Sequence, residues 1–243
     1  MAETPRPAFY AAKRGGWRDW WTVLHPPYTA WHLSYVVIGA SLAPRVHISR
    51  LVATVVAFFL AVGVAAHCLD ELHGRPLRTL IPGRALIAAT VVSLAGAVAI
   101  GVVGVVTVGA ILVPFIVVGP LLVMAYNAEL FGGIVHTDAG FAVAWGAFPV
   151  LTAYAAQAGT LAWATVLVAV GAFALSWAQR ALSTPARMLR RSVQGVDGTL
   201  TLADGTVRHL DDRFLLAPLE RALRAMSWGL VTVAAGIAVA RLA

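Results

Sequence analysis

Two neighbouring carboxylates and a run of arginines stand close together in the first half of the chain. Asp70 and Glu71 follow a long apolar stretch, and Arg75, Arg78 and Arg84 come directly after them. Two carboxylates at a helix end suit Mg²⁺, which binds through one or two carboxylates and through substrate phosphates. Arginine presents a fork of donors that matches phosphate oxygens. These types and spacings favour a diphosphate site with magnesium on Asp70 and Glu71. The alternative is a solvated helix end whose acids pair with the arginines.

His67 belongs to the same cluster because of its position on the expected helix. If the helix continues through Glu71, then His67, Asp70 and Glu71 share one face by their i, i+3 and i+4 spacing. Gly74 and Pro76 would then end the helix. We expect His67 to take part in substrate binding beside the two carboxylates.

A second polar cluster lies between two later apolar stretches and contains no lysine or arginine. We expect this connection to fold into the same cavity and to line it with Asn127, Glu129, His136 and Asp138. A simple Gly-Gly turn with polar flanks is the alternative. His25, at the start of the first apolar stretch, is a further candidate for substrate binding.

The composition indicates which elements must position these groups. Of the 243 residues, 60% are hydrophobic and only 12% are charged, and the mean hydropathy is +0.81. Soluble domains are about 45–50% apolar and about 25% charged. An ordinary soluble globule, a disordered chain and a collagen are therefore excluded. The single cysteine, Cys68, excludes an intramolecular disulfide scaffold. The chain is predicted to be an all-α, polytopic membrane helix bundle.

About seven apolar stretches have roughly the 20 residues that a membrane-spanning helix needs. They cover 27–44, 51–69, 85–105, 107–126, 139–157, 160–178 and 226–242. The predicted organisation has four parts: a basic N-terminus with an interfacial aromatic segment (1–26), a six-helix membrane core (27–178), a cytosolic insertion (179–225) and a C-terminal helix (226–243).

The distribution of charge predicts the orientation. With a cytosolic N-terminus, all of the 18 basic residues except Arg45, Arg50 and Arg241 lie on the cytosolic side, as the positive-inside rule requires. The C-terminus is then outside. In a membrane protein the net charge of +7 reports topology, so no nucleic-acid partner is expected. Lys13 is the single lysine in an alanine- and valine-rich chain, which favours a prokaryotic inner (plasma) membrane.

The insertion carries its own signal for local structure. Threonines alternate with leucines and a valine around Asp204-Gly205, and an Asp-Gly pair between alternating runs predicts a β-hairpin. We expect a short cytosolic hairpin followed by an amphipathic segment that ends at Arg224.

These features resemble the UbiA superfamily of intramembrane aromatic prenyltransferases over roughly residues 20–180. The first span opens with His25-Pro26-Pro27, and His67–Glu71 stands where the family has its first Asp-rich motif. Arg75-Pro76-Leu77 and Pro82-Gly83-Arg84 resemble the stretch that leads into its third helix, and Tyr126-Asn127 resembles the end of its fourth. The family's second Asp-rich motif has no counterpart in this chain, and its members usually have nine helices.

The resemblance implies an enzyme in which Mg²⁺ on Asp70 and Glu71 holds an isoprenoid diphosphate, assisted by Arg75, Arg78 and Arg187. Ionisation and prenyl transfer to a lipophilic acceptor would follow, with the catalytic set completed by Tyr126, Asn127, Glu129 and Asp138. A membrane terpene cyclase of the same type is one alternative. A non-catalytic lipid- or quinone-binding protein, or a partner subunit, is another, and the missing second motif favours it.

Overall fold

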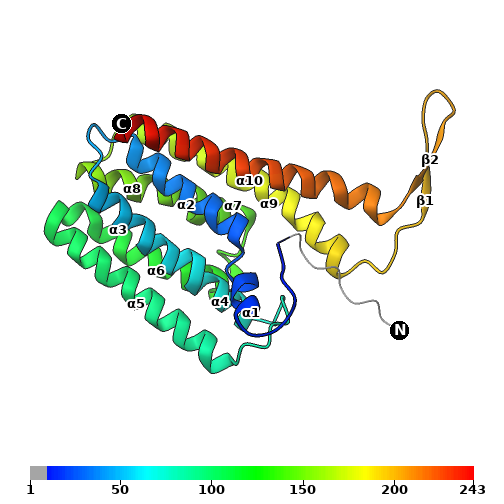
Figure 1. Ribbon diagram of the computed structural model, residues 1–243, viewed down its shortest axis with the longest axis horizontal. Coiled ribbons are helices and arrows are strands. Elements are labelled where there is room, and N and C mark those ends of the chain that lie inside the picture. Colours follow the sequence, from blue (N-terminus) through cyan, green and yellow to red (C-terminus); the bar gives the residue numbers. More distant parts are fainter. Residues whose placement is uncertain (1–9) are drawn as a thin grey trace.

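A computed structural model describes residues 10–243, apart from the side chain of Phe131. The molecule is a bundle of long helices with one small antiparallel sheet (Figure 1). Within these residues, six helices are long and apolar enough to cross a membrane: Ile48–Leu72, Gly83–Val108, Ala110–Asn127, Asp138–Ala158, Trp163–Arg191 and Asp212–Leu242. Six such helices indicate an integral membrane protein. Arg6, which counted toward the predicted orientation, lies outside the described residues.

Six of the seven predicted spans correspond to these helices. The remaining one is α2 (Pro26–Ser41), which has 16 residues and is shorter than the roughly 20 that a spanning helix needs. It begins at two prolines, which suit the first turn of a helix because its N–H groups have no helical partner. α2 packs against both α8 (Phe148–Ala158) and α10 (Asp212–Leu242). It is therefore a central element of the bundle.

Two of the spans change helical type along their length. One consists of α3 (Ile48–Phe58), the π-helical segment η1 (Phe59–Ala66) and α4 (His67–Leu72). The other consists of α7 (Asp138–Ala142), the π-helical segment η4 (Val143–Ala147) and α8. Because π-helical turns often occur at functional sites, the residues around η1 and η4 are candidates for such a site.

The third and fourth predicted spans are separated at Gly109. α5 (Gly83–Val108) ends there, and a short 3₁₀ turn, η2 (Ala110–Leu112), leads into α6 (Val113–Asn127). Gly109 has a φ of 135°, a conformation that glycine adopts without steric cost. The outer face of α5 is strongly apolar and exposed; Val92 is 71% and Val106 is 83% exposed. These side chains are suited to contact with lipid.

The predicted insertion is mostly an extension of the two helices that flank it. α9 (Trp163–Arg191) and α10 pack side by side and continue together past the rest of the bundle (Figure 1). The predicted hairpin is confirmed: β1 (Gly198–Thr201) pairs antiparallel with β2 (Val207–Leu210) around Asp204-Gly205. The Asp204 carboxylate accepts a hydrogen bond from the Thr206 N–H at 2.9 Å, and this bond lowers the pKa of Asp204.

The other short elements lie at the same end of the bundle as this extension. α1 (Trp17–Val23) precedes α2, and η3 (Leu130–Gly133) lies in the connection between α6 and α7. Asp19 of α1 is buried; its carboxylate accepts hydrogen bonds from the N–H groups of Gly15 and Leu80. Asp19 thus joins α1 to the loop that follows α4.

Candidate functional site

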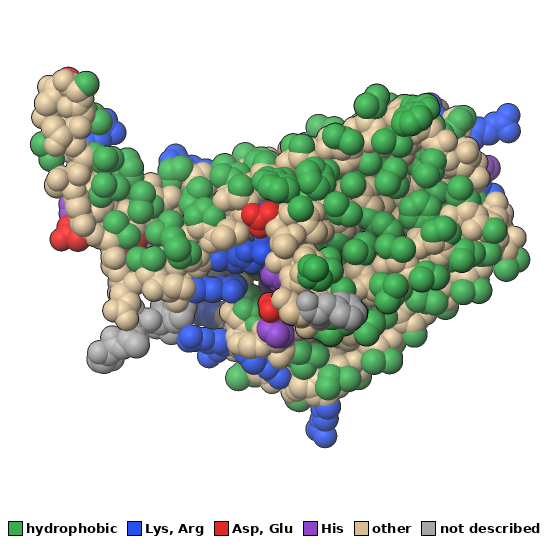
Figure 2. Space-filling view, turned by 180° about the vertical axis from the view of Figure 1, so that it is seen from behind, with side chains coloured by type: hydrophobic (Ala, Val, Ile, Leu, Met, Phe, Trp, Pro, Cys, Tyr) green, Lys and Arg blue, Asp and Glu red, His purple; other side chains and the backbone are tan. Residues whose placement is uncertain are grey.

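A cavity of about 250 Å³ opens where α2, α4, α6 and α9 meet, at the end of the bundle that carries α1. We call it the polar cavity. In Figure 2, arginine, histidine and acidic side chains gather around a hollow between the apolar body and the extended arm. Its charged and histidine lining comprises His25, His32, His67, Asp70, His73, Glu129, His136, Arg180, Arg187, Arg190 and Arg191.

The arginines of the polar cavity come from one face of α9, and they differ in their partners. Arg180 pairs with Asp138 at 3.0 Å, and Arg190 pairs with Glu220 of α10 at 2.7 Å. Arg187 donates only to the neutral Thr184 hydroxyl, at 3.3 Å. Among the described residues, no carboxylate lies within ion-pair distance of Arg187 or Arg191. The cavity therefore offers two cationic groups that an anionic ligand can neutralise.

The two carboxylates predicted to share a metal have different environments. Asp70 lines the polar cavity. Glu71 is fully buried and points to the following loop, where its carboxylate accepts hydrogen bonds from the Leu77 N–H, the Thr79 N–H and the Thr79 hydroxyl at 2.8–2.9 Å. Consecutive helical residues point about 100° apart, and here Asp70 faces the cavity whereas Glu71 faces the loop.

This difference predicts that two equivalent substitutions affect stability unequally, with a loss at Glu71 and little change at Asp70. Glu71→Gln replaces one accepting oxygen by an amide that cannot accept from the loop, and it should lower the unfolding free energy by about 2–3 kcal/mol. Asp70→Asn is the matched control, since Asp70 accepts no hydrogen bond from the described residues. Thermal unfolding in detergent measures both variants. Equal loss of stability in the two would contradict these assignments.

Three of the four candidates from the connection between α6 and α7 line the polar cavity: Asn127, Glu129 and His136. Glu129 lies 3.8 Å from His73 and 4.0 Å from His136. Asp138 does not line the cavity, but its ion pair orients Arg180, which does. The expectation that this basic-free connection folds toward a cavity thus agrees with the placement of its side chains.

Tyr126 also lines the polar cavity. Its ring stacks on that of His136 with centroids 4.4 Å apart and lies edge-on to Trp145 at 5.9 Å. The buried Tyr126 hydroxyl and the buried Gln179 amide oxygen have no hydrogen-bond partner among residues 10–243. Because buried polar groups are almost always paired, these atoms indicate that a ligand or water completes the cavity.

The arginines that the sequence assigned to phosphate binding lie elsewhere. Arg75 donates to the Ile81 carbonyl at 2.7 Å within the loop after α4. Arg78 and Arg84 are exposed, and the Arg78 carbonyl accepts a hydrogen bond from Arg14. None of Arg75, Arg78 and Arg84 lines the polar cavity. Of the predicted arginines, only Arg187 does.

The sequence did contain a signal for two of the arginines that were missed, Arg180 and Arg191. Together with the predicted Arg187 they are spaced by seven and four residues, which places all three on one face of a helix. The predicted sixth span ended at residue 178, whereas α9 continues to Arg191 with Pro185 inside it. Extending that helix past Pro185 would have brought the three arginines to one face.

His25 and His67 stand together at the inner side of the cavity. Their ring centroids are 4.5 Å apart. His25 precedes two prolines and has a left-handed backbone conformation (φ 46°). Burial, with His67 beside it and three arginines nearby, holds the pKa of His25 well below its ordinary value. Burial also raises the pKa of Tyr10, whose ring lies 5.2 Å from His25.

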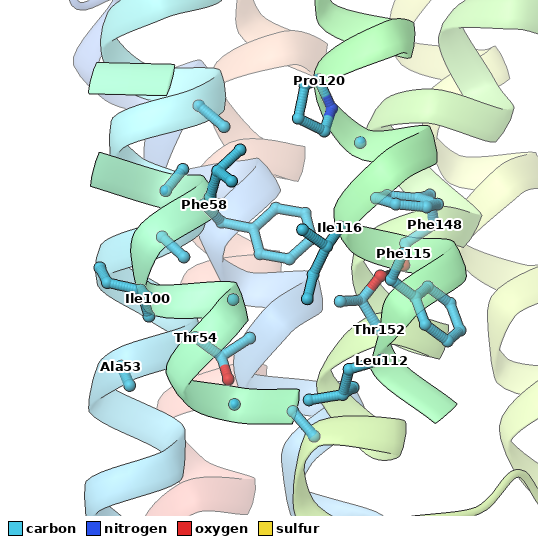
Figure 3. Close-up of a pocket in the computed structure, with 18 of the residues that line it drawn as sticks. Ala53, Thr54, Phe58, Ile100, Leu112, Phe115, Ile116, Pro120, Phe148 and Thr152 are labelled. Atoms are coloured by element: carbon cyan, nitrogen blue, oxygen red, sulfur yellow. Dashed lines mark hydrogen bonds between the residues drawn. The ribbon is translucent and has the colours of Figure 1, made fainter. Parts of the chain in front are cut away.

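A second, larger cavity of about 520 Å³ lies within the bundle between α3, η1, α5, α6, η4 and α8. We call it the apolar cavity. Figure 3 shows Phe58, Ile116 and Phe148 around it, with Thr54 and Thr152 among the polar side chains. Both threonine hydroxyls donate to carbonyls of their own helices. Its lining on α3 and η1 runs from Ser49 to Val62, which is roughly 20 Å of helix.

The two cavities share two lining residues, Val62 and Trp145. Both belong to π-helical segments, Val62 to η1 and Trp145 to η4. An extra residue in a helical turn changes which side chains face inward. These two segments thus form the boundary at which a cationic cavity meets a hydrocarbon-like one.

The residues present do not fit the predicted magnesium site. Both oxygens of Glu71 are bonded to the loop, so Asp70 remains without its expected partner. Within the described part of the chain, no group of three or more histidine, cysteine or acidic side chains is placed to hold a metal ion. The charge available for an anion at this site is therefore that of the arginines.

Comparison of the chain with protein-family models, with curated proteins and with solved structures finds no match. Its function is therefore inferred from the geometry of the two cavities. That geometry suits an amphiphile with an anionic head and an apolar tail.

Proposed function

We propose that this chain is an integral membrane enzyme that acts on an isoprenoid diphosphate. The observation that carries the proposal is a pair of adjacent cavities that share Val62 and Trp145 in their lining. One holds Arg187 and Arg191, neither of which has a carboxylate of residues 10–243 within ion-pair distance, and the other is lined mostly by apolar side chains. The diphosphate would bind in the polar cavity, and the isoprenoid chain would extend past Val62 and Trp145 into the apolar cavity. The resemblance to the UbiA superfamily supports the same substrate class.

The proposed reaction is prenyl transfer to a lipophilic acceptor. Breaking the bond between the allylic carbon and its oxygen leaves negative charge on the diphosphate, which Arg187 and Arg191 would stabilise. The electron-rich faces of Tyr126 and Trp145 can stabilise positive charge on the carbon. The acceptor would then form the new bond to this carbon and lose a proton to the released diphosphate. In a terpene cyclase, a double bond of the isoprenoid itself would capture the cation, and the proton would be lost from the cyclised product.

The proposed topology has seven crossings, with α2 as a short first span, and places the polar cavity on the cytosolic side. Nearly all basic residues then lie in the cytosol, as the positive-inside rule favours. Soluble isoprenoid diphosphates would reach the cavity from that side.

The proposal is tested with purified protein in lipid nanodiscs and a series of labelled isoprenoid diphosphates. We expect saturable binding, retained in the presence of EDTA, and release of inorganic diphosphate once a suitable acceptor is supplied. If the protein binds none of these diphosphates, whatever their chain length and whether or not Mg²⁺ is present, the proposal is refuted.

The apolar cavity predicts a selectivity for chain length. Ala57 lines it, whereas the neighbouring Val56 is on the exposed face of α3. The phenylalanine of Ala57→Phe should occupy part of the cavity and weaken binding of geranylgeranyl diphosphate by about tenfold, because less of the apolar surface of this long ligand can then be buried. The effect on the short dimethylallyl diphosphate should be smaller. Competition binding measures both ligands. The control Val56→Phe should change neither; the same loss in both variants would contradict the assignment of the cavity.

A non-catalytic isoprenoid- or quinone-binding protein is the second candidate. The observation that favours it is the placement of Glu71, which removes one of the two carboxylates expected of a catalytic metal site. Stoichiometric binding of the diphosphate without its release, across a range of acceptors, would support this candidate over the enzyme.

A further inference from the structure

Three histidines of the polar cavity are oriented by the same type of contact. The Nδ1 atom of His32 lies 2.9 Å from the Trp145 carbonyl, that of His67 lies 3.0 Å from the Gly63 carbonyl, and that of His136 lies 2.9 Å from the Tyr126 carbonyl. A carbonyl oxygen can only accept a hydrogen bond, so each Nδ1 carries a proton. In the neutral ring, each Nε2 is then an acceptor.

The three Nε2 atoms differ in what they contact. That of His136 faces the Arg180 guanidinium at 3.4 Å. Those of His32 and His67 have no hydrogen-bond partner among the residues that the structure describes. His32 is only 4% exposed and lines the polar cavity. With Nδ1 held by the backbone, the Nε2 of His32 is open to a hydrogen bond from a donor that enters the cavity.

The surroundings of His32 indicate the kind of donor. The rings of Phe141 and Trp145 lie 5.7 and 6.5 Å from it, and Trp145 also lines the apolar cavity. Asp70 and the Gln179 amide oxygen add further acceptors to the same cavity. A fully ionised phosphate has only acceptor oxygens and cannot donate to these groups. A hydroxyl on an apolar molecule can donate to them.

We propose that His32 and His67 form a subsite for the hydroxyl group of a neutral, lipophilic compound, separate from the arginines that hold an anion. The hydroxyl of this compound donates a hydrogen bond to the Nε2 atom of one of the two histidines, and the apolar part of the compound lies against Trp145 and Phe141. Only the identification of this compound as the acceptor of the transfer rests on the proposed function. Binding of the hydroxyl compound can be measured without any diphosphate.

The test compares geranylgeraniol with its methyl ether, which has the same hydrocarbon tail and no donor. In nanodiscs, the wild-type chain should bind the alcohol about fivefold more tightly than the ether, as one hydrogen bond permits. His32→Asn keeps a donor near the Trp145 carbonyl and removes one of the two acceptors, so it should reduce the preference, and the double variant with His67→Asn should abolish it. His67→Asn does the same at the Gly63 carbonyl. If one of these two variants does not fold, the other is used for the comparison of alcohol and ether binding.

His209→Asn is the control, because His209 lies in the hairpin, away from the cavity, and its side chain is 65% exposed; it should keep the fivefold preference. Equal affinity of wild-type protein for alcohol and ether, or a preference that survives in a folded His32→Asn, His67→Asn double variant, would overturn the subsite. Binding of geranylgeranyl diphosphate is measured in parallel. Its absence would count against the proposed function alone.

Discussion

Replacing Arg187 and Arg191 together by glutamine should weaken the binding of geranylgeranyl diphosphate by at least about 100-fold. Each charge-assisted hydrogen bond is worth about 1.5–3 kcal/mol, and about 1.4 kcal/mol corresponds to a factor of ten. The fold should not suffer, because neither guanidinium pairs with a carboxylate of the described residues. Removing two like charges that lie close together also relieves their repulsion. Equilibrium binding and thermal unfolding are measured on the same samples.

The control for this prediction removes the same amount of charge from the same arm. Arg213 and Arg221 lie on α10 and do not line the polar cavity. An Arg213→Gln, Arg221→Gln double variant should bind the diphosphate within about twofold of wild type. A similar loss in both double variants would show that general electrostatic attraction, and not the cavity, accounts for the affinity.

Gly39→Ala should prevent the bundle from assembling normally. A Cβ at Gly39 would lie 2.3 Å from the Val150 carbonyl oxygen and 2.8 Å from its Cα, both backbone atoms of α8. Backbone cannot move aside as a side chain can, so α2 and α8 would have to separate. Small residues are what let membrane helices approach so closely. We expect a loss of about 3 kcal/mol or more, seen as a low yield of monodisperse protein and a large fall in melting temperature.

Gly171→Ala provides the comparison, because it makes the same change within a helix where there is room. Apart from the nearby backbone of α9 itself, no atom of residues 10–243 lies within 4 Å of a Cβ at Gly171. Alanine is also the better helix former by about 1 kcal/mol. This variant should be as stable as wild type or slightly more so. If Gly39→Ala matched it, the close packing of α2 on α8 would be contradicted.

Much of the fold could be predicted because it depends on long apolar runs and on turn chemistry. The span ending near Leu72, the break at Gly109 and the hairpin at Asp204-Gly205 each have a local signal. The continuation of α9 to Arg191 was missed because charged residues and Pro185 resemble the end of a span. A helix that extends beyond the membrane keeps its helical spacing of side chains, although its residues are no longer hydrophobic. In this chain the spacing of the arginines is the sequence feature that indicates the extension.

The site was predicted in part, for a related physical reason. Asp70, His67, Tyr126 and Glu129 line the polar cavity as expected. Glu71 does not, because one helical position rotates it toward the loop at Thr79. Which of two adjacent acids faces a cavity depends on the rotation of the helix about its axis. Here that rotation follows η1, a π-helical segment whose presence an apolar sequence does not signal.

Whether a diphosphate head and its hydrocarbon chain occupy the two cavities is tested by a structure of the protein in lipid with a non-hydrolysable thio-analogue of geranylgeranyl diphosphate. We expect phosphate oxygens within hydrogen-bond distance of Arg187 and Arg191. We also expect the hydrocarbon chain to pass between Val62 and Trp145 into the apolar cavity. A ligand bound elsewhere on the molecule, or both cavities empty at a saturating concentration of ligand, would contradict this placement of the ligand.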